Sequence, residues 1–116
     1  MYENILLPTD GSDTVSAVAE HAGSLARQYD ATVHVLSVVD TRNRFEGPSL
    51  GLGSEAWEEA ERERAERAVA DAVDALPDDV ATTRAVESGV PHTEIFEYAE
   101  SADIDVIVMG THGRTG

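Results

Sequence analysis

Apolar and polar positions alternate along this chain with two different periods, and the two periods divide it into strands and helices. Short runs rich in apolar and β-branched residues predict strands, at residues 3–10, 31–40, 80–89 and 104–110. Longer segments repeat apolar residues at helical spacing, at residues 12–30, 54–77 and 90–103. The runs at 31–40 and 104–110 are nearly continuous in apolar character, which is typical of buried strands, whereas 80–89 alternates as an edge strand does.

Strands that are separated by helices of this length indicate parallel βαβ units. The sequence therefore predicts one α/β domain over residues 1–116: an open parallel sheet with right-handed connections and helices on both faces. Ligands of such sheets bind outside the carboxyl ends of the strands, where the strand order reverses. We expect three segments to share this rim: PTDGS (8–12), VVDTRNRF (38–45) and GTHGRTG (110–116).

The last of these segments is a glycine loop at the end of an apolar run. Gly110, Gly113 and Gly116 have a G-x-x-G-x-x-G spacing, and glycines let a phosphate approach bare backbone N–H groups. The loop also carries side chains that suit an anion: Thr111, His112, Arg114 and Thr115. It is neither a Walker A loop nor a Rossmann fingerprint. Phosphate binding and a simple turn between strand and helix both remain open.

Two further rim positions have a ligand-binding and a structural interpretation. Asp10 follows the first strand, where a carboxylate receives ribose hydroxyls or holds a divalent cation. It equally starts a turn that leads into the following helix, which Ser12 or Asp13 then caps. The backbone of Val38, after the second strand, is a candidate contact for a base edge. Asp40 lies similarly, and we interpret it as structural.

The composition excludes several functions. The chain has 23 acidic and 8 basic residues, a formal net charge of −15, and every basic residue is an arginine. Binding to nucleic acid by phosphate neutralisation needs clustered cations and is not expected. There is no cysteine, no basic signal segment at the start and no apolar run of membrane length. We expect a cytoplasmic protein, and the acidity favours a halophilic source, where salt screens self-repulsion.

The sequence shows no catalytic set. His21 lies within a predicted helix and His34 within a predicted strand, so both are interpreted as structural, and no histidine pair has metal-ligand spacing. No G-x-S-x-G elbow is present. The charged run 58–67 is interpreted as a solvated helix face. A flavin carrier on a flavodoxin-like sheet is a weaker alternative, because the rim has few aromatic residues and no hydroxyl-rich loop after the first strand.

Three stretches together resemble the universal stress protein family: NILLPTDGSDTVSAVAEHAGSLA (4–26), ATVHVLSVVD (31–40) and ADIDVIVMGTHGRTG (102–116). The resemblance covers essentially the whole chain in the family's order of segments. Its most specific part, DVIVMGTHGRTG, matches the start of the family's ATP-binding pattern, G-x(2)-G-x(9)-G-[ST], with Gly110 and Gly113 as the first two glycines.

The resemblance implies a Rossmann-like adenine-nucleotide-binding fold, akin to the adenine nucleotide α-hydrolases, with strand order 3-2-1-4-5. It implies a stress-response regulator that binds ATP, with Mg²⁺ or Mn²⁺ accompanying the nucleotide and Asp10 as the candidate metal ligand. Any ATPase activity would be slow and incidental. The nucleotide-binding residues that it implies are Pro8, Thr9, Asp10, Val38, Met109, Gly110, Thr111, His112, Gly113, Arg114, Thr115 and Gly116. The alternative is an interaction module that binds no nucleotide, which the same family also contains.

The chain departs from the family pattern at its end. The third glycine would fall at position 123, and the family's last helix and fifth strand would follow it. We expect the family's homodimer only with that segment present, because members commonly pair through the fifth strand. We also expect weaker ATP binding than in an extended chain, since a helix N-terminus offers aligned N–H donors to phosphates. The strand at 104–110 is expected to expose an unpaired edge.

Overall fold

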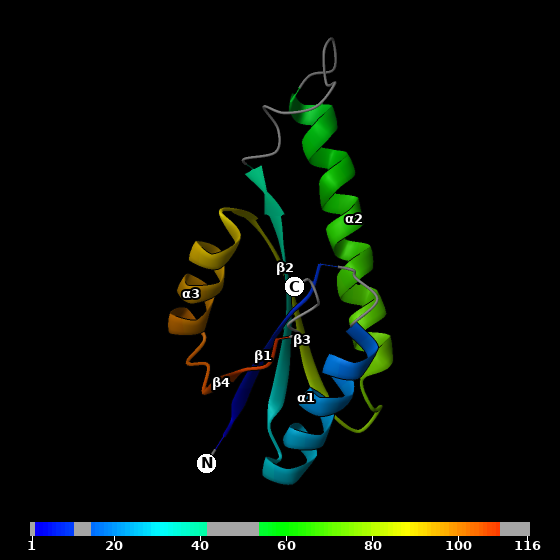
Figure 1. Ribbon diagram of the computed structural model, residues 1–116, viewed down its shortest axis with the longest axis vertical. Coiled ribbons are helices and arrows are strands. Elements are labelled where there is room, and N and C mark those ends of the chain that lie inside the picture. Colours follow the sequence, from blue (N-terminus) through cyan, green and yellow to red (C-terminus); the bar gives the residue numbers. More distant parts are fainter. Residues whose placement is uncertain (1, 11–14, 42–53, 110–116) are drawn as a thin grey trace, which may run out of the picture.

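The computed structural model describes residues 2–10, 15–41 and 54–109 (Figure 1). All seven predicted elements are present. They are β1 (Asn4–Pro8), α1 (Val15–Tyr29), β2 (Thr32–Asp40), α2 (Ser54–Ala75), β3 (Ala81–Gly89), α3 (Pro91–Ser101) and β4 (Val106–Ile107). Within the described residues, no helix is both long and apolar enough to cross a membrane. The N-caps expected at Ser12 or Asp13 lie outside the described residues.

The four strands form one parallel sheet in the order β3-β2-β1-β4. β1 lies between its two partners, with Ile5 opposite Val33 of β2 on one side and opposite Val106 of β4 on the other. This order confirms the predicted α/β class, and it is the family order for the strands that the chain contains. The predicted edge character of β3 is confirmed as well, because most of its residues are exposed.

The helices cover both faces of the sheet, as predicted. α1 and α2 pack against each other and against one face, while α3 lies on the opposite face (Figure 1). Alternating strand residues point to the two sides. The main core lies on the side of α1 and α2, and its strand residues include Ile5, Leu7, Val33 and Val35. The helices meet them largely through alanines, at positions 19, 22, 26 and 72, so the helix backbones come close to the sheet.

The two shorter helices end in the same way. Asp30 after α1 and Asp103 after α3 both have a left-handed backbone, with φ of 56° and 55°. The N–H of Ala31 donates to the carbonyl of Ala26 at 2.9 Å, a bond that closes the end of α1. Short polar residues such as aspartate tolerate this conformation better than most residues do. The turn at Asp103 directs the chain from α3 into β4.

The expectation of a buried strand at 104–110 is wrong for its described residues, 104–109. Ladder pairing is confined to Val106–Ile107, whose side chains are half-buried, and Met109 is 57% exposed. Val108 alone is buried, and its N–H donates to the carbonyl of Leu6 at 2.9 Å. Among the described residues β4 has a strand neighbour only in β1, so it is an edge strand, as β3 is, and this accounts for its incomplete burial.

Candidate functional site

The carboxyl ends of β1, β2 and β4 form the rim on which the predicted site residues fall. The connection from β1 leads to β2 on one side, and the connection from β3 returns across the sheet to β4 on the other side. The strand order therefore reverses at β1, which is the position where open parallel sheets bind ligands. The described part of this rim comprises residues 8–10, 38–41 and 109.

β2 extends past the end of β1 at this rim. The β1–β2 register ends where Pro8 lies opposite Leu36. One more bond follows, from the N–H of Thr9 to the carbonyl of Leu36 at 2.8 Å. β2 continues to Asp40 and stays paired with β3, as far as Gly89. The last part of β2 thus has a described strand partner on one side and lies beyond the end of β1 on the other.

The backbone of Val38 faces the side that β1 leaves open. The N–H of Thr32 donates to Glu3 at 2.9 Å, and the carbonyl of Leu36 accepts from Thr9, so the even-numbered residues of β2 turn their backbone groups toward β1. Val38 has the same parity, and no described residue of β1 lies opposite it. It therefore presents one N–H donor and one carbonyl acceptor to the rim.

The remaining described site residues lie around this position. Thr9 is half-buried and Asp10 is exposed, and both take part in further interactions within the fold. Leu6 lies opposite Ile107, so extending this register by two residues places Met109 beside Pro8. The structure thus brings the described members of the predicted site to one rim. The others, Gly110 to Gly116, lie outside the described residues.

A second polar cluster lies on the α3 side of the sheet and has a structural role. Nδ1 of His34 is 2.8 Å from the hydroxyl oxygen of Tyr98, and Nε2 is 3.0 Å from Oδ1 of Asn4. The Asn4 amide NH₂ donates to the carbonyl of Asp103, so its Oδ1 accepts from Nε2–H and Nδ1 accepts from Tyr98. Burial lowers the pKa of His34, and burial together with the charge of Glu87 raises the pKa of Tyr98. The interpretation of His34 as structural is confirmed.

Metal ligands are sparse in the part of the chain that the structure describes. No group of three or more histidine or acidic side chains there lies close enough together to hold a metal ion. A cation at the rim would therefore need oxygen ligands from a bound molecule in addition to Asp10.

The charged run of α2 is solvated as predicted, and it contains an ion pair between Arg64 and Glu61 at 3.7 Å.

The fold and its rim define a doubly wound α/β protein with its candidate ligand site at the topological switch point. A protein-family model described as the Universal stress protein family matches residues 1–116. The chain belongs to the universal stress protein family, as the sequence resemblance implied.

Individual relatives agree with this assignment. The universal stress protein MJ0531 of Methanocaldococcus jannaschii is 38% identical over 122 residues, covering 100% of this chain and 68% of the relative. The crystal structure of a universal stress protein family member from Burkholderia pseudomallei matches with a TM-score of 0.76 at 26% identity, over 96% of this chain and 83% of its own. A universal stress protein crystallised in complex with cAMP shares the fold, with a TM-score of 0.56 at 19% identity, over 91% of this chain and 70% of its own.

Proposed function

We propose that this protein binds ATP or another adenine nucleotide at the rim of β1, β2 and β4 and acts as a stress-response regulator. The observation that carries the proposal is the extension of β2 beyond β1. It leaves the backbone of Val38 facing the rim at the switch point of the sheet. The match of a related fold crystallised with cAMP supports the class of ligand.

Each rim residue has a defined part in this proposal. The N–H and carbonyl of Val38 hydrogen-bond the edge of the adenine base, and Asp10 accepts hydrogen bonds from the ribose hydroxyls. Pro8, Thr9 and Met109 line the pocket. The glycine loop of residues 110–116 contacts the phosphates through its backbone amides. Mg²⁺ or Mn²⁺ would be bound mainly by phosphate oxygens, with Asp10 as its carboxylate ligand.

The role that we propose for the protein is regulatory and not catalytic. We assign no catalytic residue, so any hydrolysis of ATP would be slow and incidental to binding. The proposed setting is the cytoplasm, and the proposed assembly is a homodimer when the family's C-terminal segment is present. ATP occupancy would then change conformation or partner choice.

Titration calorimetry with ATP, adenosine and GTP tests the binding proposal. We expect ATP to bind and GTP to bind more weakly, because guanine presents different groups to the Val38 backbone. Asp10→Asn should lower the affinity for ATP and adenosine by about tenfold, since the charged carboxylate acceptor is replaced by a neutral amide oxygen. Asp78→Asn is the matched control, because Asp78 is an exposed aspartate at the amino-end rim, between α2 and β3, and should leave the affinity unchanged.

Two outcomes would contradict the proposal. No measurable binding of any adenine nucleotide would favour the alternative, an interaction module that binds no nucleotide. Equal effects of Asp10→Asn and Asp78→Asn would show that the ligand responds to total charge and does not bind at this rim. Nucleotide analysis of the molecule that copurifies with the protein provides an independent check, and its absorbance also separates adenine from flavin.

A further inference from the structure

Asp105 directly precedes β4, at the opposite end of the sheet from the candidate rim. Its side chain is exposed, yet it has defined partners: Oδ2 accepts the N–H of Glu3 at 2.7 Å and the N–H of Asn4 at 2.9 Å. The N–H groups of Asn4 and Glu3 lower the pKa of Asp105, which favours its charged form. One carboxylate oxygen thus makes two charge-assisted hydrogen bonds to the start of β1.

The main chain of β4 is held to β1 by few bonds. The ladder comprises two residue pairs, Val106 and Ile107 with their partners in β1. Beyond it, the N–H groups of Asp105 and Val108 donate to carbonyls of β1 at 2.8 Å and 2.9 Å. So short a ladder specifies the register weakly, and a slip of one residue would turn the core side chain of Val108 to the other face. The bonds to the Asp105 carboxylate therefore add to the few contacts that fix this register.

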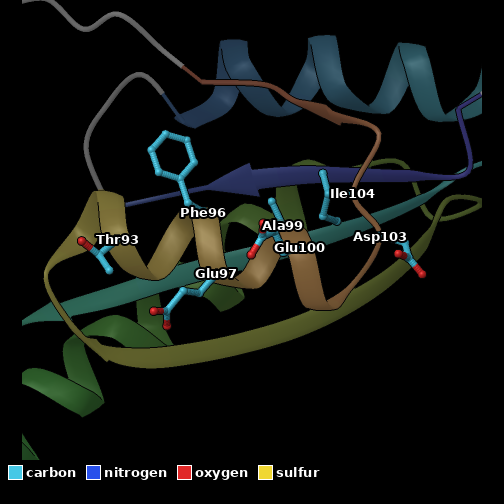
Figure 2. Close-up of a pocket in the computed structure, with 7 residues that line it drawn as sticks. All are labelled: Thr93, Phe96, Glu97, Ala99, Glu100, Asp103 and Ile104. Carbon is cyan, nitrogen blue, oxygen red and sulfur yellow. The ribbon is translucent and has the colours of Figure 1, made fainter.

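Asn4 joins the same end of β4 to the rest of the fold. Its side-chain amide donates to the carbonyl of Asp103 at 3.4 Å, and its Oδ1 accepts from His34 of β2. Figure 2 shows Asp103 and Ile104 in the turn through which the chain leaves α3 and enters β4. This turn is thus bound to β1 through the carbonyl of Asp103 and through both the N–H and the carboxylate of Asp105.

β4 connects this anchored turn with the rim. Met109 follows Asp105 by four residues, about 13 Å along an extended strand, and the glycine loop continues from Met109 in the sequence. Val38 and Asp10 belong to β2 and to the segment after β1, so β4 does not position them. The placement of β4 therefore concerns the phosphate side of the proposed site more than its base and ribose side.

We propose that Asp105 is a positioning residue of the nucleotide site. Its carboxylate fixes the register of β4 on β1, and it thereby sets where Met109 lies and where the glycine loop leaves the sheet. Asp105 touches no ligand in this arrangement and acts through β4 alone. The inference rests on the proposed function, because the groups that it positions are those assigned to ATP.

The test compares the affinities for ATP and for adenosine by titration calorimetry at fixed salt. We expect Asp105→Ala to lower the affinity for ATP by about fivefold more than the affinity for adenosine, which is the effect of one lost hydrogen bond. Asp105→Asn should keep the ratio of the two affinities within about twofold of the native ratio, because one amide oxygen can replace Oδ2 as the acceptor of both N–H groups.

Two control variants separate positioning from charge and from lost stability. Asp78→Ala removes an exposed aspartate at the same end of the sheet, and Val69→Ala removes core contacts of α2. Both should leave the ratio of ATP affinity to adenosine affinity unchanged. In the ligand-free protein, Asp105→Ala should speed hydrogen exchange of the Val108 N–H more than exchange of the β2 amides, because β4 then opens locally.

Four results would overturn the inference. An unchanged ratio in Asp105→Ala would show that β4 needs no carboxylate to place the loop. An equal fall in Val69→Ala would reduce the effect to lost stability, and an equal fall in Asp105→Asn would contradict the acceptor role of Oδ2. If the native chain binds no adenine nucleotide, the proposed function fails and the inference with it. Faster exchange at Val108 in Asp105→Ala would then identify a contact that serves the fold alone.

Discussion

At the scale of single residues, His34 shows how a histidine within a strand is satisfied without a ligand. Both ring nitrogens have partners from other elements, Tyr98 on α3 and Asn4 on β1. The sequence placed His34 correctly inside a strand but could not identify these partners, because they lie 64 and 30 residues away along the chain. The same limit applies to Asp105, whose carboxylate accepts the N–H groups of Glu3 and Asn4.

We predict that His34 makes stability depend on pH near neutrality. Burial lowers its pKa below the ordinary value of 6.5, so the unfolded chain takes up this proton at a higher pH than the folded chain. The free energy of unfolding should therefore fall as the pH drops through 6.5 toward the folded pKa, and this contribution levels off below it. Urea unfolding at about pH 7.5 and pH 5.5 measures the change.

The comparison chain is His34→Gln, which removes the titrating ring and leaves the carboxylates in place. Glu87, near Tyr98, and the other acidic groups contribute to the pH dependence of both chains. The stability advantage of the native chain over His34→Gln should shrink on acidification. An advantage that stays constant over this pH range would contradict the prediction.

At the scale of elements, the contact between α1 and the end of α2 depends on a glycine. Gly23 lies in the middle of α1 and is buried. A Cβ atom built on it would lie 2.7 Å from Cδ of Pro77, the proline that follows α2. Pro77 cannot move aside as a flexible side chain would, because its ring is closed on the backbone. The glycine thus sets how closely the two helices approach.

We predict that Gly23→Ala destabilises the protein although alanine is the better helix former. The gain in helix propensity is about 1 kcal/mol, and the cost of overpacking at such a site is about 1–3 kcal/mol. Ser24→Ala, at the exposed neighbouring position, is the control and should be neutral or stabilising by up to about 0.5 kcal/mol. Urea unfolding compares the stabilities of the Gly23→Ala and Ser24→Ala variants. Equal stabilisation by the two substitutions would show that α1 can move away from Pro77 without cost, contrary to the prediction.

The elements also show how far the sequence could predict the fold and the site. β2 was expected at 31–40 and is found at Thr32–Asp40, because a continuous apolar, β-branched run leaves few alternatives. The apolar run at 104–110 predicts a strand with an unpaired edge, but it does not show how many of its residues pair with β1, and the ladder is confined to Val106–Ile107. For the same reason the rim positions of Asp10 and Val38 were predicted, but the extension of β2 past β1 was not, since it depends on the register between strands.

At the scale of the whole molecule, charge is the dominant feature. The net charge of −15 belongs to 116 residues without a single lysine, and the ion pair of Arg27 with Asp79 at 3.1 Å is exposed. Exposed pairs contribute little to stability. Mutual repulsion of carboxylates therefore opposes the compact state, and salt should weaken this repulsion.

We predict that KCl raises the melting temperature of this protein. Between about 0.05 M and 0.5 M salt, where the Debye length falls to a few ångströms, the increase should be about 5 °C or more. The Glu63→Gln/Glu66→Gln chain, with two charges fewer, should show a smaller increase. A melting temperature that stays level or falls with KCl would mean that self-repulsion does not limit stability and would remove the physical reason for a halophilic source.

The order of the strands has a consequence for how the protein is made. Of the four described strands, β1 leaves the ribosome first, yet it has both of its strand partners only when Ile5 meets Val106 of β4, the last of the four. β1, β2 and β3 can join during translation, and until β4 emerges the nascent sheet exposes one side of its own central strand. A ribosome that stalls after α3 would therefore present Ile5 and Leu6, both fully buried in the finished fold, on an open strand edge to neighbouring nascent chains.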